Sequence, residues 1–163
     1  MRAFSRIQLP LVVAIALNGV APTQAQVSLQ SQLTGTWKLT ASYEIYADGH
    51  KTEFFKNAQG VAEFTPGGTF IFEEMGGDRT PIPGTFPPQP VGPAIAFYAT
   101  YTVDEQNKTY TYHVQQSTFP QWNGASRTST ITEVSPTVLK VATEVVHDPK
   151  GDFVPHLEYE RIK

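Results

Sequence analysis

The sequence predicts an all-β domain whose strands form an up-and-down antiparallel barrel of about eight to ten strands. No segment after Leu33 keeps a helical period over three turns. Instead, short runs rich in Thr, Val, Tyr and Phe are separated by turn residues, a spacing typical of all-β sandwiches and barrels. We favour the barrel because sequential hairpins that close on themselves leave no exposed strand edge. A two-sheet sandwich is the competing arrangement.

The first strand and its turn show the alternation most clearly. Between residues 36 and 46, every second residue is apolar, as a strand with one buried face requires. The residues expected on the buried face are Trp37, Leu39, Ala41, Tyr43 and Ile45. Asp48 and Gly49 then supply a tight turn, because glycine adopts the positive φ that such turns use.

The rest of the domain is expected to alternate strands and turns. A short helical turn over 28–33 precedes the first strand, and the further strands are expected over 52–55, 60–65, 69–75, 95–103, 109–117, 127–134, 137–146 and 154–162. Residues 76–93 interrupt the pattern with six prolines and four glycines, so regular strands are not expected there. We interpret this segment as a loop that crosses between strands, because neither flank forms a core alone.

The N-terminal residues have the layout of a secretory signal. A basic start, an uncharged apolar centre and small residues before Ala25 follow one another. The apolar centre is shorter than the roughly 20 residues of a membrane-spanning helix, which is the alternative interpretation. We therefore expect a signal peptide over 1–25, cleaved after Ala25, and one barrel domain over 26–163. The mature protein is then secreted or periplasmic, without stable membrane insertion.

Composition excludes several classes of function. The 163 residues include 12 Lys and Arg, 15 Asp and Glu and no Cys, with a formal net charge of −3. Loss of Arg2 and Arg6 with the signal changes this charge to −5. A slightly acidic domain has no electrostatic footprint for nucleic acid. The lack of Cys excludes disulfides, thiolate nucleophiles and sulfur-ligated metals, and neither a cofactor nor a metal is expected.

A set of ordered motifs resembles a known family. The Gly35–Trp37 segment, preceded by a short helical turn, resembles the entrance motif of lipocalins. Four segments occur in order along the chain: Leu33–Leu39, which contains this motif, Thr65–Gly68, Tyr98–Asp104 and Pro120–Gly124. Together they resemble the bacterial and fungal lipocalin-like domain family over residues 33–162, although Ala99 stands where glycine is expected.

The resemblance implies a barrel with an internal cavity for an apolar or amphipathic small molecule. It also implies that Trp37 closes one end of the barrel against an arginine near the chain end, for which Arg161 is the candidate. A guanidinium stacked on an indole forms a favourable cation–π pair.

Aromatic side chains are the first candidates for a ligand-binding surface. We expect Phe97 and Tyr101, with Tyr112 and Leu139, to line the interior of the barrel. Tyrosine hydroxyls inside a cavity orient a polar ligand group within an apolar pocket. The alternative is that these side chains simply fill a solid core, as in many small barrels.

Three further candidates lie on the strands and loop after residue 110. His113 binds or protonates a ligand if it faces the interior, but alternation places it opposite Tyr112. Trp122 is either a lid over the cavity or a plug packed on the rim. Arg127 either reaches a carboxylate at the barrel mouth or forms a surface ion pair, which is the more common role of exposed arginine.

The sequence shows no catalytic constellation. None of the four histidines lies in a local metal-ligand spacing, and no nucleophile elbow, phosphate loop or calcium loop is present. Glu73 and Glu74 are adjacent, so on a strand they point to opposite faces and do not act as a pair. The sequence therefore favours a non-enzymatic, exported barrel that binds a small hydrophobic or amphipathic molecule.

Two other functions stay open. One is an isomerase- or cyclase-type enzyme that uses the cavity, with His113 or Glu74 as its acid or base. The other is a structural or stress-related envelope protein without a ligand.

Overall fold

The structure is a computed structural model, and it describes residues 27–80, 83–84 and 92–162. The signal peptide expected over residues 1–25 lies outside the described residues. So does most of the proline-rich part of the loop expected over 76–93.

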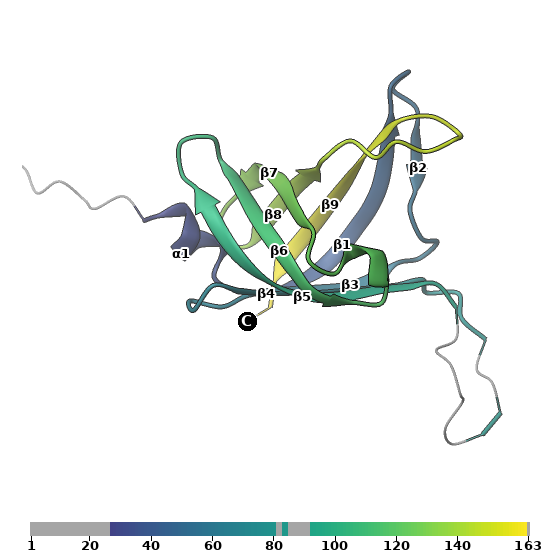
Figure 1. The fold of residues 1–163 in the computed structure, drawn as a ribbon, viewed down its shortest axis with the longest axis horizontal. Coiled ribbons are helices and arrows are strands. Elements are labelled where there is room, and N and C mark those ends of the chain that lie inside the picture. Colours follow the sequence, from purple (N-terminus) through teal and green to yellow (C-terminus); the bar gives the residue numbers. More distant parts are fainter. Residues whose placement is uncertain (1–26, 81–82, 85–91, 163) are drawn as a thin grey trace, which may run out of the picture.

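One short helix and nine strands make up the described part of the chain (Figure 1). In order they are α1 (Leu29–Leu33), β1 (Gly35–Tyr46), β2 (Lys51–Glu53), β3 (Gln59–Phe64), β4 (Thr69–Met75), β5 (Ala94–Asp104), β6 (Thr109–Ser117), β7 (Ser126–Val134), β8 (Val138–Thr143) and β9 (Phe153–Arg161). A 3₁₀ turn, η1 (Pro120–Trp122), lies between β6 and β7. These elements match the expected strands to within a few residues, except that β8 ends at Thr143 rather than near residue 146.

The strands form a closed antiparallel barrel. β1 pairs with β3, each later strand pairs with the next, and β9 returns to pair with β1 along Trp37–Tyr46. Eight strands thus form the barrel wall, and β2 is an additional short strand on β1 beyond β3. The pairing of β9 with β1 excludes the two-sheet sandwich and confirms the predicted up-and-down barrel.

The end of the barrel next to α1 is closed. Ser28 caps the helix by accepting a hydrogen bond from the Ser31 amide at 3.1 Å, and Leu29 and Leu33 are buried. The Trp37 indole donates to the Leu33 carbonyl oxygen at 2.7 Å. Figure 1 shows α1 at one end of the barrel and the β1–β2 and β8–β9 connections at the opposite end. Any opening to the interior therefore lies at the end opposite α1.

A β-bulge in β1 corrects one sequence expectation. Leu39 pairs with Tyr159 and Ala41 with Glu158, so Thr40 is an extra residue that reverses the alternation after it. Trp37 and Leu39 face the core as expected, but the expectation for Ala41, Tyr43 and Ile45 is wrong.

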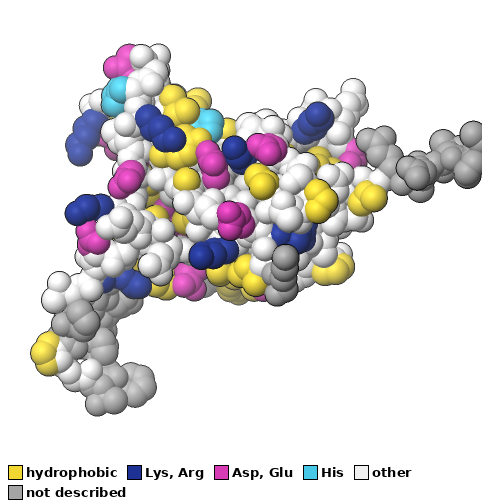
Figure 2. All heavy atoms as spheres, turned by 180° about the vertical axis from the view of Figure 1, so that it is seen from behind, with side chains coloured by type: hydrophobic (Ala, Val, Ile, Leu, Met, Phe, Trp, Pro, Cys, Tyr) yellow, Lys and Arg dark blue, Asp and Glu magenta, His cyan; other side chains and the backbone are white. Residues whose placement is uncertain are grey.

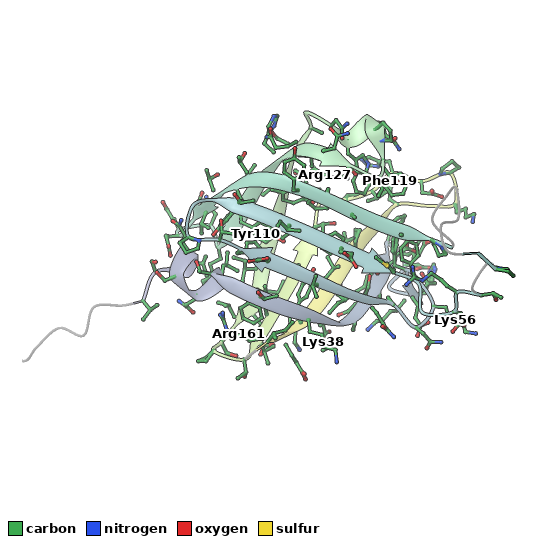
Figure 3. All side chains as sticks on the ribbon, turned by 90° about the horizontal axis from the view of Figure 1, so that it is seen from below. Lys38, Lys56, Tyr110, Phe119, Arg127 and Arg161 are labelled. Carbon is green, nitrogen blue, oxygen red and sulfur yellow. The ribbon has the colours of Figure 1, made fainter. Side chains whose placement is uncertain are left out.

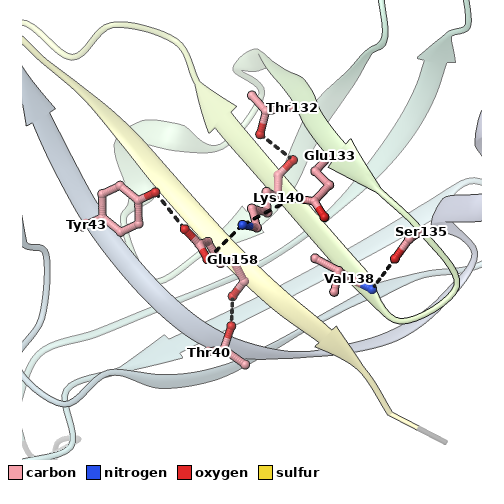
Figure 4. A network of polar contacts seen from close by, with 8 residues as sticks. All are labelled: Thr40, Tyr43, Thr132, Glu133, Ser135, Val138, Lys140 and Glu158. Atoms are coloured by element: carbon pink, nitrogen blue, oxygen red, sulfur yellow. Dashed lines mark hydrogen bonds and ion pairs between the residues drawn. The ribbon is translucent and has the colours of Figure 1, made fainter.

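On the outer face, Tyr43 joins a polar network with β8 and β9 (Figure 4). Its hydroxyl donates to Glu158 Oε1 at 2.9 Å, and Lys140 Nζ lies 3.6 Å from Glu158 Oε2. The reversal that sends Tyr43 outward turns Ser42 into the barrel.

The outer surface carries charges of both signs. The face shown in Figure 2 has acidic and basic side chains interspersed, without a large block of either sign. Among the described residues, no helix has both the length and the apolar character needed to cross a bilayer.

Candidate ligand-binding cavity

The barrel holds a partly open cavity of about 250 Å³. Residues from all nine strands except β2 and β3, together with the connecting segments, line it. Most of the lining side chains are aromatic, polar or charged, and the others are Ile95, Val146, Pro155 and Leu157. The described residues that line the cavity are Ser42, Phe54, Phe70, Phe72, Glu74, Ile95, Phe97, Tyr110, Tyr112, Trp122, Arg127, Ser129, Thr143, Val146, Phe153, Pro155, Leu157 and Tyr159. The interior is therefore hollow at this end rather than filled throughout.

Packed aromatic rings form one wall of the cavity. Phe97 stacks on Tyr112 with ring centres 5.4 Å apart, and Phe70 meets both rings edge to face at 5.5 and 5.3 Å. Phe72 lies 5.2 Å from Phe97. These side chains lie on the buried faces of β4, β5 and β6. Edge-to-face and stacked pairs are the favoured aromatic geometries, so this wall is fixed before a ligand arrives.

A buried carboxyl group is the main polar feature. Glu74 is only 2% exposed, and its Oε1 has no hydrogen-bond partner among the described residues. Burial raises the pKa of Glu74 above its usual value, and the nearby Ser42 hydroxyl partly opposes that shift. An unpartnered buried carboxyl is costly to the fold, so its place on a cavity wall points to a ligand.

Hydroxyl groups surround the same space. Ser129 is 1% exposed, and its Oγ also lacks a hydrogen-bond partner among the described residues. Burial raises the pKa of Tyr112 to about 12, and it raises the pKa values of Tyr110 and Tyr159 as well. These tyrosines therefore stay neutral at physiological pH and act as hydrogen-bonding groups.

The partly exposed end of the cavity carries a tryptophan and an arginine. Trp122 in η1 packs on Phe119 at 4.9 Å and meets Phe97 edge to face at 6.3 Å. The Arg127 guanidinium lies 4.9 Å from the Trp122 ring centre, a cation–π contact. Figure 3 shows Arg127 and Phe119 toward the end opposite α1, with Tyr110 closer to α1. We call Trp122 and Arg127 the rim pair.

The structure brings four of the six sequence-predicted site residues together. Phe97, Tyr112, Trp122 and Arg127 all line the cavity. Trp122 packs against Phe119 and Phe97 and also lines the cavity.

The other two predicted residues do not reach the cavity. Tyr101 faces inward but lies in the packed core toward α1, where its hydroxyl donates to the Thr65 carbonyl oxygen at 3.0 Å. His113 is exposed on the outer face, with Nδ1 3.1 Å from Ser126 Oγ, so its interior position is wrong. The reason is strand alternation, which turns Tyr112 inward and His113 outward. Leu139, also expected in the lining, is completely buried in the core outside the cavity.

Sequence reasoning missed several polar lining residues. Ser42 was hidden by the β1 bulge, for which the sequence has no plain signal. Ser129 and Tyr159 share the parity of Ile131 and Leu157 on their strands, and this parity was the available signal. In the described part of the chain, no group of three or more His, Cys, Asp or Glu side chains is placed to hold a metal ion.

Comparisons with known proteins concern the fold alone. No protein-family model matches the chain, and no curated protein matches its sequence. Similar solved structures include a de novo designed fluorescence-activating β-barrel, with 18% identity over 84% of this chain and all of that one and a TM-score of 0.44.

Two further structures show the same level of similarity. The complex of bovine odorant binding protein with a selenium-containing odorant has 15% identity over 88% of this chain and 78% of that one, with a TM-score of 0.44. A redesigned barrel bound to DFHBI has 21% identity over 83% of this chain and all of that one, with a TM-score of 0.42.

Proposed function

We propose that this protein is an exported, non-enzymatic barrel that binds one small, mainly apolar molecule with a polar group. The observation that carries the proposal is the internal cavity, in which a fixed aromatic wall faces the unpartnered oxygens of Glu74 and Ser129. Apolar walls with a few convergent polar groups are the usual design of small-molecule sites. The motif resemblance to lipocalin-like domains supports the same conclusion.

The cavity volume limits the size of the ligand. A cavity of about 150 Å³ in another protein holds benzene, which has about six non-hydrogen atoms. On that scale, the cavity of about 250 Å³ takes a molecule of about ten non-hydrogen atoms. The ligand is therefore a compact ring or branched chain rather than a long fatty acid.

A thermal-shift screen with one cavity-filling variant tests the proposal. Compact apolar and amphipathic compounds should raise the melting temperature of the wild-type protein, because a ligand that binds only the folded state stabilises it. Leu157→Trp fills part of the cavity and should remove these shifts. Val154→Trp adds the same side chain to the outer face of the same strand and should keep them. Absence of a shift for every compound would contradict the proposal and favour a purely structural role.

A second candidate function is an enzyme that uses Glu74 as a general acid or base. The specific observation in its favour is a buried carboxyl with a raised pKa on a cavity wall. Recovery of the bound compound distinguishes the two functions. A carrier returns the compound unchanged, whereas an enzyme returns a product that Glu74→Gln no longer forms.

Export rests on the sequence of the first 25 residues. The proposal predicts that the protein isolated from the periplasm or the culture medium begins at Gln26. N-terminal sequencing checks this, and a mature chain that still begins at Met1 would contradict it.

A further inference from the structure

The position of Glu74 narrows the chemistry of the ligand. Glu74 lies near the end of β4, next to Glu73, which points to the outer face. It pairs in register with Gly60 on β3 and Ile95 on β5, neither of which offers a polar side chain. The Glu74 carboxyl therefore faces the cavity without a partner from its neighbouring strands.

Among the described residues, no charged or titratable side chain around the cavity provides a counter-charge next to the Glu74 carboxyl. Ser42 on β1, Tyr110 and Tyr112 on β6 and Tyr159 on β9 are neutral hydroxyl groups. Among the described residues, Arg127 is the one basic side chain in the lining, and its guanidinium lies over Trp122 at the rim. No ion pair joins Arg127 to Glu74 in the described part of the chain.

The aromatic wall adds a second preference for positive charge. Ring faces attract cations within about 6 Å of their centres, and the attraction grows when water is excluded. Phe70, Phe97 and Tyr112 line the same cavity as Glu74. A cation bound at Glu74 thus meets an opposite charge and a polarisable wall together.

Other classes of ligand compensate the buried Glu74 carboxyl less well. A carboxylate brings its own negative charge beside the Glu74 carboxyl, and even if the two groups share one proton the pair stays negative without a counter-charge. A hydrocarbon leaves the Glu74 oxygen unpartnered, and an alcohol supplies one hydrogen bond without charge. A protonated amine supplies both hydrogen-bond donors and the missing charge.

We propose that the ligand is a protonated primary amine on a compact aromatic or branched apolar body, with its ammonium group hydrogen-bonded to Glu74 Oε1. This inference rests on the proposed binding function and assigns its substrate class. The apolar body packs against the wall formed by Phe97 and Tyr112, and the rim pair covers it.

Isothermal titration calorimetry with four probes of similar size tests the inference. The probes are 2-phenylethylamine, 2-phenylethanol, propylbenzene and phenylacetate. The amine should bind at least tenfold more tightly than the alcohol, and phenylacetate should bind most weakly. Glu74→Gln keeps the shape of the side chain and should weaken amine binding at least tenfold while leaving propylbenzene within about twofold. Glu73→Gln, on the outer face of the same strand, should leave all four affinities unchanged.

The outcomes separate this inference from the proposed function. Equal binding of the amine and propylbenzene, or no effect of Glu74→Gln on the amine, overturns the amine assignment and leaves the carrier function standing. Failure of all four probes to bind overturns both. If Glu74→Gln does not fold, wild-type titrations in two buffers of different ionisation heat replace it. Amine binding should then release protons, because Glu74 ionises as the ammonium binds, and the absence of proton release overturns the inference.

Discussion

The guanidinium carbon of Arg161, at the end of β9, lies 3.9 Å from the centre of the Trp37 indole on β1. Its Nη1 donates to the Thr34 carbonyl oxygen at 2.7 Å and its Nε to the Pro136 carbonyl oxygen at 2.8 Å. Nη2 donates to the Gln32 carbonyl oxygen near the C-terminus of α1. One side chain thus ties the first strand, the last strand and the helix together at the closed end, as the motif resemblance implied.

Replacing this arginine should destabilise the barrel. Arg161→Met removes the cation–π contact and three charge-assisted hydrogen bonds, so the free energy of unfolding should fall by about 2–4 kcal/mol. Urea denaturation measures the change. Lys150→Met removes a basic group from an exposed turn and should stay within about 0.5 kcal/mol of the wild type. A loss as small as that of the control would show that Arg161 does not hold the closed end.

Gly35 is the residue that lets Arg161 approach. Its φ is +128°, and a Cβ at this position would lie 2.5 Å from Arg161 Nη1. Gly35→Ala should therefore lower the free energy of unfolding by about 1–3 kcal/mol through backbone strain and displacement of the arginine. At Gly67 a Cβ would have no heavy atom nearer than 3.9 Å, so Gly67→Ala is the matched control. Equal melting temperatures for the two variants would contradict the role of Gly35.

The raised pKa of Glu74 predicts an unusual pH dependence of stability. The folded chain holds the Glu74 proton more tightly than the unfolded chain does. The stabilisation that this gives to the folded state is therefore fully present below pH 4.5 and is lost as the pH rises through the pKa of Glu74 in the folded chain. The stability of the wild type relative to Glu74→Gln should fall over this range, by up to about 1.4 kcal/mol per pH unit. Urea denaturation across pH 4–8 measures the difference.

The control for this measurement is Glu73→Gln, which removes a carboxylate from the outer face of the same strand. A difference between the wild type and Glu74→Gln that stays constant with pH would show that Glu74 has the same pKa in the folded and unfolded chains and is not desolvated. A difference that rises with pH would show a stabilising partner for the carboxylate.

Tyr112 predicts a loss of stability in alkali. Burial raises the pKa of Tyr112 from 10 to about 12. The stability that the neutral Tyr112 hydroxyl gives to the folded state is therefore fully present below pH 10 and is lost as the pH rises through 12. The stability of the wild type relative to Tyr112→Phe should decrease by about 3 kcal/mol over this interval. Denaturation at pH 9, 10, 11 and 12 follows the decrease, with Tyr98→Phe on the outer face as the control. A flat difference would place Tyr112 in contact with water.

Strand alternation predicts most of this fold because a barrel wall has one buried face. It places nine strands close to their observed positions, and the Trp37 motif correctly points to Arg161. Alternation fails where a bulge adds a residue, as at Thr40, because one extra residue sends every later side chain to the opposite face. Tyr43 and Ser42 exchange faces for this reason.

The candidate site is less predictable than the fold because alternation gives the face but not the depth. Tyr101 and Phe97 share one face of β5, yet only Phe97 reaches the cavity and Tyr101 lies in the packed core. Glu74 shares its parity with Phe70 and Phe72, so its inward direction follows from the pattern. The missing hydrogen-bond partner of Glu74 Oε1 does not follow from the pattern. It depends on which side chains the six other strands that line the cavity bring near this carboxyl.

The most direct test of the internal site is a crystal structure of the protein grown with 2-phenylethylamine. The expected result is one molecule inside the barrel, with its nitrogen within hydrogen-bonding distance of Glu74 Oε1 and its ring beside Phe97 and Tyr112. A barrel whose side chains close over the space, with no compound inside, would contradict it.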